Sequence, residues 1–77
     1  MQEFHIALHS LQQVKEFVSL AMVQPFEVMV GNEHQSINGK DLMGMFCLDF
    51  SAPLSVQMRC SVEEYNQFRS CAEAFVI

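Results

Sequence analysis

The sequence has little charge for its length. Of its 77 residues, only four are Lys or Arg and nine are Asp or Glu, so the formal net charge is −5 and charged residues make up 17%. A typical soluble domain has roughly 25%. The scarcity of cations argues against a protein that follows the phosphates of a nucleic acid. Hydrophobic residues make up 51%, more than so small a body can bury. We therefore expect either an unusually apolar surface or an apolar surface that a partner partly covers.

The sequence also lacks a long hydrophobic run. The longest apolar stretch covers residues 17–23 and is interrupted by Ser19, far short of the roughly 20 residues that span a bilayer. The chain begins Met1-Gln2-Glu3 and carries no hydrophobic export signal. We therefore expect a cytoplasmic protein that does not insert into a membrane.

The cysteines provide no disulfide framework. Their number is odd and no two have the C-x-x-C spacing. We interpret Cys47, Cys60 and Cys71 as free thiols, buried or half-buried on apolar faces, in a reducing compartment. Since the sequence also has no linker, internal repeat or low-complexity tract, we expect a single domain over residues 1–77.

The hydrophobic pattern switches between the period of strands and the period of helices. We predict strands at 4–8, 26–30, 34–37 and 54–60, and helices at 11–21, 40–48 and 61–75. Ser10 with Gln13, and Ser61 with Glu64, have the spacing of a capping box at a helix start. The order βαββαβα predicts an α+β fold, with a four-stranded antiparallel sheet and helices packed on one face.

No pattern indicates catalysis or a cofactor. His5 and His9 are four residues apart near the end of a predicted strand, without an acidic or thiol ligand adjacent in sequence, and His34 lies in a predicted turn. Only three glycines are present, so the sequence has no glycine-rich phosphate loop. We expect no metal, no cofactor and no enzymatic activity.

The stretch N-G-K-D-L-M-G-M-F-C-L, residues 38–48, carries a resemblance to a known family. Together with the order of elements, it resembles HPr, the histidine-containing phosphocarrier of the bacterial phosphoenolpyruvate-dependent sugar phosphotransferase system. In that family the stretch typically reads K-S-I-M-G-V-M-S-L. The resemblance extends over essentially the whole chain and implies an HPr-like open-faced β-sandwich with a role in, or near, bacterial sugar transport.

The resemblance does not extend to the motif that the family phosphorylates. The family signature is G-I/L-H-A-R-P-A, in which the histidine accepts phosphate and the arginine neutralises it. Aligned from the second strand backwards, Ser10 takes the histidine position, Gln12 the arginine position and Gln13 the proline position. An unactivated hydroxyl is a poor phosphoryl acceptor, and a glutamine cannot replace a guanidinium. His9 is adjacent to the acceptor position and remains an alternative acceptor.

Two further features follow from the resemblance. Asp41 takes the position of the regulatory serine that a kinase phosphorylates in many family members; it either caps the short helix or imitates part of the charge of phosphoserine. Leu42, Met43 and Phe46 take positions with which the family docks partner proteins, and they would not all fit inside so small a body. Met45 and Leu48 are expected in the core.

The sequence therefore predicts a degenerate HPr-like domain that cannot be phosphorylated in the usual way. We expect it to bind proteins of the phosphotransferase system, or regulatory proteins, through Leu42, Met43 and Phe46. One alternative is a functioning phosphocarrier that uses His9. Another is a structural module that associates with itself through the apolar surface.

Overall fold

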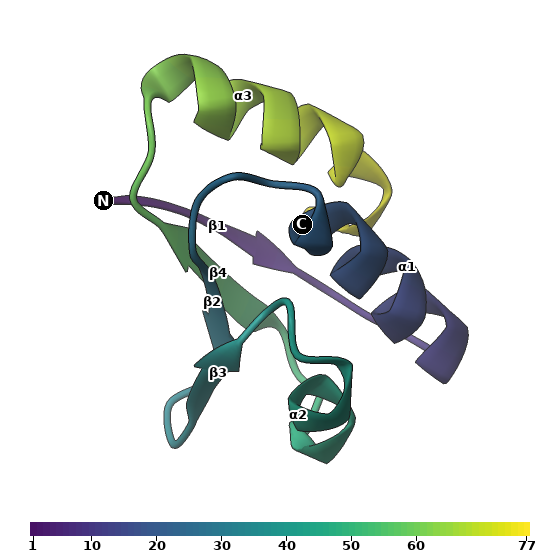
Figure 1. Cartoon of the computed structure of the whole chain (residues 1–77). Helices are drawn as coiled ribbons and strands as arrows, with labels where there is room; N and C mark the ends of the chain where they lie inside the picture. The colour runs from purple at the N-terminus through teal and green to yellow at the C-terminus, as the bar shows by residue number, and fades with distance from the viewer.

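The predicted order of strands and helices is confirmed in the computed structural model, which describes all residues, 1–77. The elements are β1 (Gln2–Ile6), α1 (Leu11–Met22), β2 (Val28–Gly31), β3 (Ser36–Asn38), α2 (Leu42–Cys47), β4 (Leu54–Met58) and α3 (Val62–Cys71), followed by a 3-10 turn (Glu73–Phe75). The strands form one sheet in the order β1-β4-β2-β3, and every neighbouring pair is antiparallel. The helices lie together on one face of this sheet (Figure 1).

The core lies between the sheet and the helices. Alternating side chains of β1, β2 and β4 point into it, because successive residues of a strand face opposite sides of the sheet. Seventeen hydrophobic residues form one buried cluster, and no polar or charged residue is buried. Phe68 of α3 is fully buried, with its ring 5.7 Å from that of Phe4 and 5.9 Å from that of Phe26. Contacts with these rings join α3 to the sheet.

The end of the chain differs from the prediction of one helix over 61–75. The helix α3 stops at Cys71, and Phe75 belongs to the separate 3-10 turn. This turn places the Phe75 ring 6.4 Å from that of Phe17 and lets Val76 pair with Ile6 at the outer edge of β1. An uninterrupted helix would carry these last residues away from β1, so packing of Phe75 accounts for the break.

The two predicted capping boxes form differently. At α3 the Ser61 hydroxyl accepts from the Glu64 N–H and the Glu64 carboxylate accepts from the Ser61 N–H, both at 3.0 Å, which completes the box. At α1 the Ser10 hydroxyl accepts from the Gln13 N–H at 3.2 Å. The Gln13 side chain, however, accepts from the N–H of His9 at 2.7 Å rather than from that of Ser10. The prediction for α1 is therefore only half correct.

The expected burial of all three thiols is wrong for two of them. Cys60 is half-buried, and burial raises the pKa of its thiol, with the Glu64 charge adding to the effect. Cys47 and Cys71 are both exposed. Each is the last residue of a helix, and the buried side of each helix faces the sheet with other residues, Met45 in α2 and Phe68 in α3.

Candidate functional site

At the start of α1, side chains of the same segment accept hydrogen bonds from its free N–H groups. Ser10 precedes the helix with an extended backbone, φ −157° and ψ 162°, which is the conformation of a capping residue. Its hydroxyl and the Gln13 side chain accept from the N–H groups of Gln13 and His9. Gln12 is exposed, and the first turn, residues 11–14, carries no charged side chain. An anion at this helix end would meet the helix dipole but no cationic side chain from that turn.

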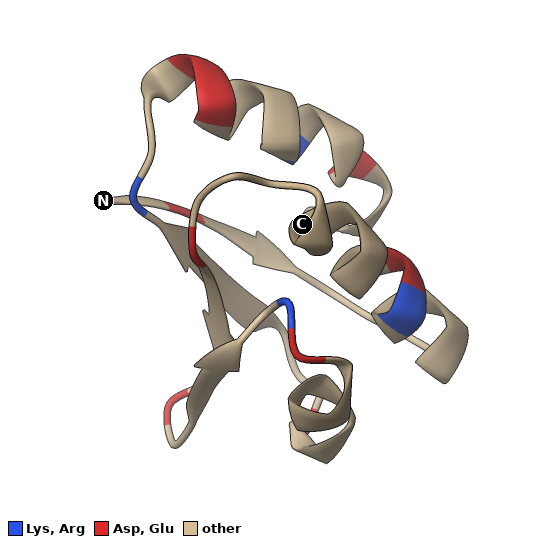
Figure 2. Cartoon of the chain, in the orientation of Figure 1, with Lys and Arg blue, Asp and Glu red and all other residues tan.

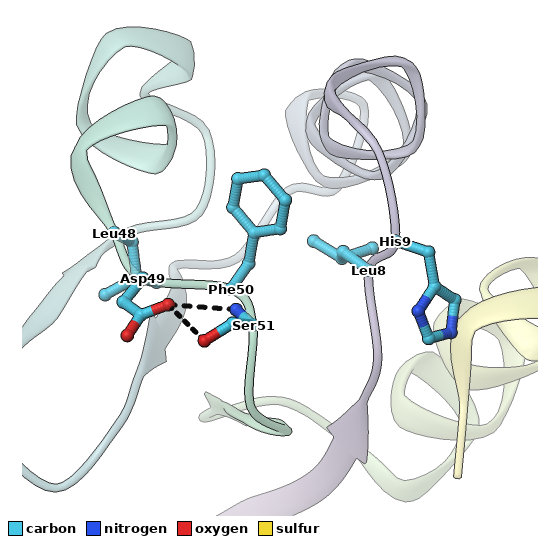
Figure 3. Close-up of a pocket in the computed structure, with 6 residues that line it drawn as sticks. All are labelled: Leu8, His9, Leu48, Asp49, Phe50 and Ser51. Atoms are coloured by element: carbon cyan, nitrogen blue, oxygen red, sulfur yellow. Dashed lines mark hydrogen bonds between the residues drawn. The ribbon is translucent and has the colours of Figure 1, made fainter.

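His9 does not point toward the cavity beside it. An open cavity of about 450 Å³ lies between the segment that follows β1 and the loop that follows α2, and His9 and Phe50 are among the residues lining it. Figure 3 shows the Phe50 ring standing between the two segments, whereas the His9 imidazole points to the opposite side. On the far side of the cavity, the Ser51 hydroxyl and N–H both donate to Asp49, and these bonds lower the pKa of its carboxyl. The Ser10 hydroxyl is hydrogen-bonded to the Gln13 N–H and not to a base.

Asp41 begins α2 and acts as its cap. Its carboxylate accepts from the Gly44 N–H at 3.2 Å, and a carboxylate at a helix start is favourable in itself. A Cβ at Gly44 would lie 2.9 Å from the Asp41 carboxylate, so a side chain at residue 44 would require the capping carboxylate to shift. This hydrogen bond gives Asp41 a structural role as a helix cap, which accounts for an acidic residue here without a regulatory function.

The three residues with predicted docking roles have different exposures. Met43 is 71% exposed, whereas Leu42 and Phe46 are half-buried and pack against the edge of the core. Met45, between them in sequence, is only 1% exposed. The prediction that Met45 and Leu48 lie in the core is confirmed. The helix α2 thus offers a ridge with Met43 at its most exposed point.

An additional apolar residue lies on α1, which contacts α2. Leu11 begins α1 and is 57% exposed. In the sequence, Leu11 has the same helical spacing as the core residues of α1, so nothing in the pattern marked it as exposed. We name Leu11, Leu42, Met43 and Phe46 the α1–α2 surface.

The α1–α2 surface contains little charge. The ribbon of α2 carries no charged residue, and the charges of α1 lie beyond its first turn (Figure 2). Lys40, which precedes α2, donates from its ammonium group to the Gln24 carbonyl oxygen at 2.7 Å and so joins this segment to the end of α1. Recognition at this surface would depend mainly on apolar contact.

The remaining polar groups do not form a metal centre. No group of three or more His, Cys, Asp or Glu side chains lies in an arrangement that could hold a metal ion.

On the sheet face away from the helices, Ser55 and Gln57 donate to the Glu3 carboxylate and lower its pKa, Ser55 having the larger effect. No helix is both long and apolar enough to cross a bilayer.

Comparisons with known proteins show the fold. A solved structure described as HPr-C-His from Thermoanaerobacter tengcongensis superposes with a TM-score of 0.75, covering 96% of this chain and 93% of that one. The chain has an HPr-like fold. The two sequences are 20% identical, and neither a protein-family model nor a curated protein matches this sequence. The predicted HPr-like open-faced β-sandwich is therefore confirmed.

Proposed function

We propose that this chain is a single HPr-like domain, residues 1–77, that binds other proteins and does not carry phosphate. Its place would be the bacterial cytoplasm, in or near the sugar phosphotransferase system, where it would act as a regulatory binding protein rather than an enzyme. The HPr-like fold supports the relation to the phosphocarrier family. The finer function depends on two features of this chain, the start of α1 and the α1–α2 surface.

The observation that carries the proposal is the use of Ser10 as a helix cap. At the position that the resemblance gives to the acceptor histidine, the hydroxyl is engaged with the Gln13 N–H. Phosphoryl transfer to a side chain requires an activated nucleophile and positive charge where the phosphoryl charge accumulates. Gln12 provides no charge, and no base contacts Ser10. These features support a role without phosphorylation at Ser10.

The same geometry makes His9 a poor substitute acceptor. Its imidazole points away from the cavity shared by the two loops (Figure 3), and its backbone N–H is held by Gln13. Transfer to His9 would also find no arginine in the adjoining first turn of α1, residues 11–14. We therefore favour binding without transfer over the alternative of a phosphocarrier that uses His9.

The surface that remains suited to binding is the α1–α2 surface. Methionine is unbranched and polarizable, which favours adaptable apolar contact, and Met43 is the most exposed residue of this surface. By the resemblance, we propose the phosphotransferase proteins that dock on HPr as the partners. Asp41 would contribute by fixing the start of α2, because its carboxylate caps that helix.

Binding to the general phosphotransferase enzyme tests this function. Titration calorimetry should detect binding by the wild-type chain, and Met43→Asp should weaken it at least tenfold, because a desolvated and unpaired charge is costly in an interface. Val62→Asp is the matched control: Val62 is 66% exposed and begins α3 rather than α1 or α2. Equal losses in both variants, or no binding by the wild type, would contradict the proposed partner.

The test also separates docking from self-association. Sedimentation of the purified chain with and without Phe46→Ser would show whether Phe46 joins two copies. We expect a monomer in both cases. A dimer that Phe46→Ser dissociates would favour the self-associating module instead.

Asp41 has its own test. Asp41→Asn keeps a side-chain oxygen at the cap but removes the charge. Pull-down with the regulatory partners of the family should therefore recover the wild type and Asp41→Asn equally. Lower recovery of Asp41→Asn would show that the charge imitates phosphoserine.

A further inference from the structure

The helix α2 exposes two sulfur atoms and buries a third. Met43 and Cys47 are four residues apart, which places them on one side of a helix, and both are exposed. Met45 is 1% exposed and belongs to the core. Neither Met43 nor Cys47 is among the partly buried residues that pack against the core, unlike Leu42 and Phe46. One helix therefore offers one accessible and one inaccessible methionine only two residues apart.

We propose that the α1–α2 surface is redox-sensitive: a peroxide oxidises Met43, removes the apolar character of this surface without unfolding the chain, and thereby prevents docking. The docking part of this inference rests on the proposed function. The change in the surface depends only on the exposure of Met43 and on the uncharged composition of α2.

The chemistry uses an oxidant of the peroxide class. The thioether sulfur of Met43 donates a lone pair to one peroxide oxygen, an S–O bond forms as the O–O bond breaks, and the other oxygen leaves as water. The sulfur is oxidised by two electrons to the sulfoxide, and the peroxide is reduced. The Cys47 thiolate reacts in the same manner to give a sulfenic acid and hydroxide.

Oxidation would change the surface more than the fold. A sulfoxide is polar, and an apolar partner that covered it would leave its oxygen without a hydrogen-bond donor. The helix α2 has no charged side chain with which to compensate for the lost apolar contact. Stability should be spared because Met43 contributes nothing to the buried cluster.

Hydrogen peroxide treatment of the whole chain tests the chemistry. Fragment-ion mass spectrometry should show Met43 oxidised at least tenfold faster than Met45, and the thermal unfolding midpoint should not change. Retention on a hydrophobic-interaction column under native conditions should fall after treatment. Equal rates at Met43 and Met45, or a lowered unfolding midpoint, would overturn the proposal.

Two leucine variants assign the effect to its residue. Met1 and Met22 are also exposed, at 73% and 61%, and are oxidised in every chain that keeps them. Met43→Leu stays apolar and cannot be oxidised at residue 43, so peroxide should lower its retention less than that of Met22→Leu, which keeps Met43. Loss of retention in Met43→Leu equal to that of the wild type would overturn the proposal. Titration of the general phosphotransferase enzyme with treated and untreated chain completes the test: no binding by the untreated chain contradicts the proposed function, while the column and the mass spectra still decide the redox property.

Discussion

Removal of the Ser10 hydroxyl is the perturbation that separates its structural role from a chemical one. Ser10 is exposed, and its hydroxyl bonds to the Gln13 N–H at 3.2 Å. Ser10→Ala therefore opens no cavity and removes only the cap. Loss of such a cap costs about 1 kcal/mol, within a range of about 0.5–2 kcal/mol.

That loss is measurable in so small a protein. A chain of this size has a total stability of about 4–12 kcal/mol, and about 1 kcal/mol lowers its melting temperature by roughly 4–8 °C. Urea unfolding followed by circular dichroism should show the loss in Ser10→Ala. Ser10→Asp should match or exceed the wild type, because a carboxylate both caps the helix and interacts favourably with its dipole.

The reasoning would be refuted by either of two results. Ser10→Ala could unfold at the same urea concentration as the wild type, in which case the hydroxyl is no cap. Ser10→Asp could lose as much stability as Ser10→Ala, in which case this helix end does not accept an anionic group. The first result would remove the argument that the fold engages the Ser10 hydroxyl, and the second would remove the argument that the helix dipole favours an anionic group at this position.

Three further experiments test the packing of the core, the Asp41 cap of α2 and the pH dependence of stability. Phe68→Ala should cost about 3–5 kcal/mol, because the ring is fully buried; a melting temperature like that of the wild type would contradict this. Gly44→Ala should not raise the stability of the wild type, although alanine favours a helix over glycine by about 1 kcal/mol, because its Cβ would lie 2.9 Å from the Asp41 carboxylate. In Asp41→Ala the same change should stabilise by about 1 kcal/mol, and equal effects in the two backgrounds on urea unfolding would exclude the clash. The bond from Ser55 lowers the pKa of Glu3, so the stability it contributes is present above the unfolded pKa of about 4.3 and is lost as the pH falls through the lower folded pKa. Glu3→Gln should therefore make the urea midpoint depend less on pH between about pH 5 and 2. The same pH dependence in Glu3→Gln and the wild type would refute the link.

Most of the elements could be predicted because apolar residues recur with different periods in strands and in helices; the helix α2, apolar at almost every position, has no such period. The complete box at Ser61 and Glu64 also followed from sequence, since both partners are local. The break before Phe75 could not be foreseen, because the helical spacing continues through it and only contact with Phe17 and β1 favours the turn. Local patterns thus predict elements, while packing decides where they end.

The position of the candidate site could be predicted from the sequence, but which of its side chains are exposed could not. The Ser10–Gln13 spacing placed a cap at the start of α1, yet the bond from His9 to Gln13 depends on how the chain enters the helix. In α2 almost every residue is apolar, so its hydrophobic pattern alone does not reveal which side faces the sheet, and the burial of Met45 and Leu48 was expected only alongside the family resemblance. Burial of Met45 sets that side and leaves Met43 and Cys47 exposed.

The central claim is that this HPr-like chain does not carry phosphate, and phosphoryl transfer tests it most directly. The wild-type chain is incubated with phosphoenolpyruvate and the general phosphotransferase enzyme, with an active HPr as the positive control, and its intact mass is measured without acid. We predict that HPr gains one phosphoryl group and that this chain gains none. A phosphoryl group on the wild-type chain that is labile in acid and absent from His9→Ala would contradict the account.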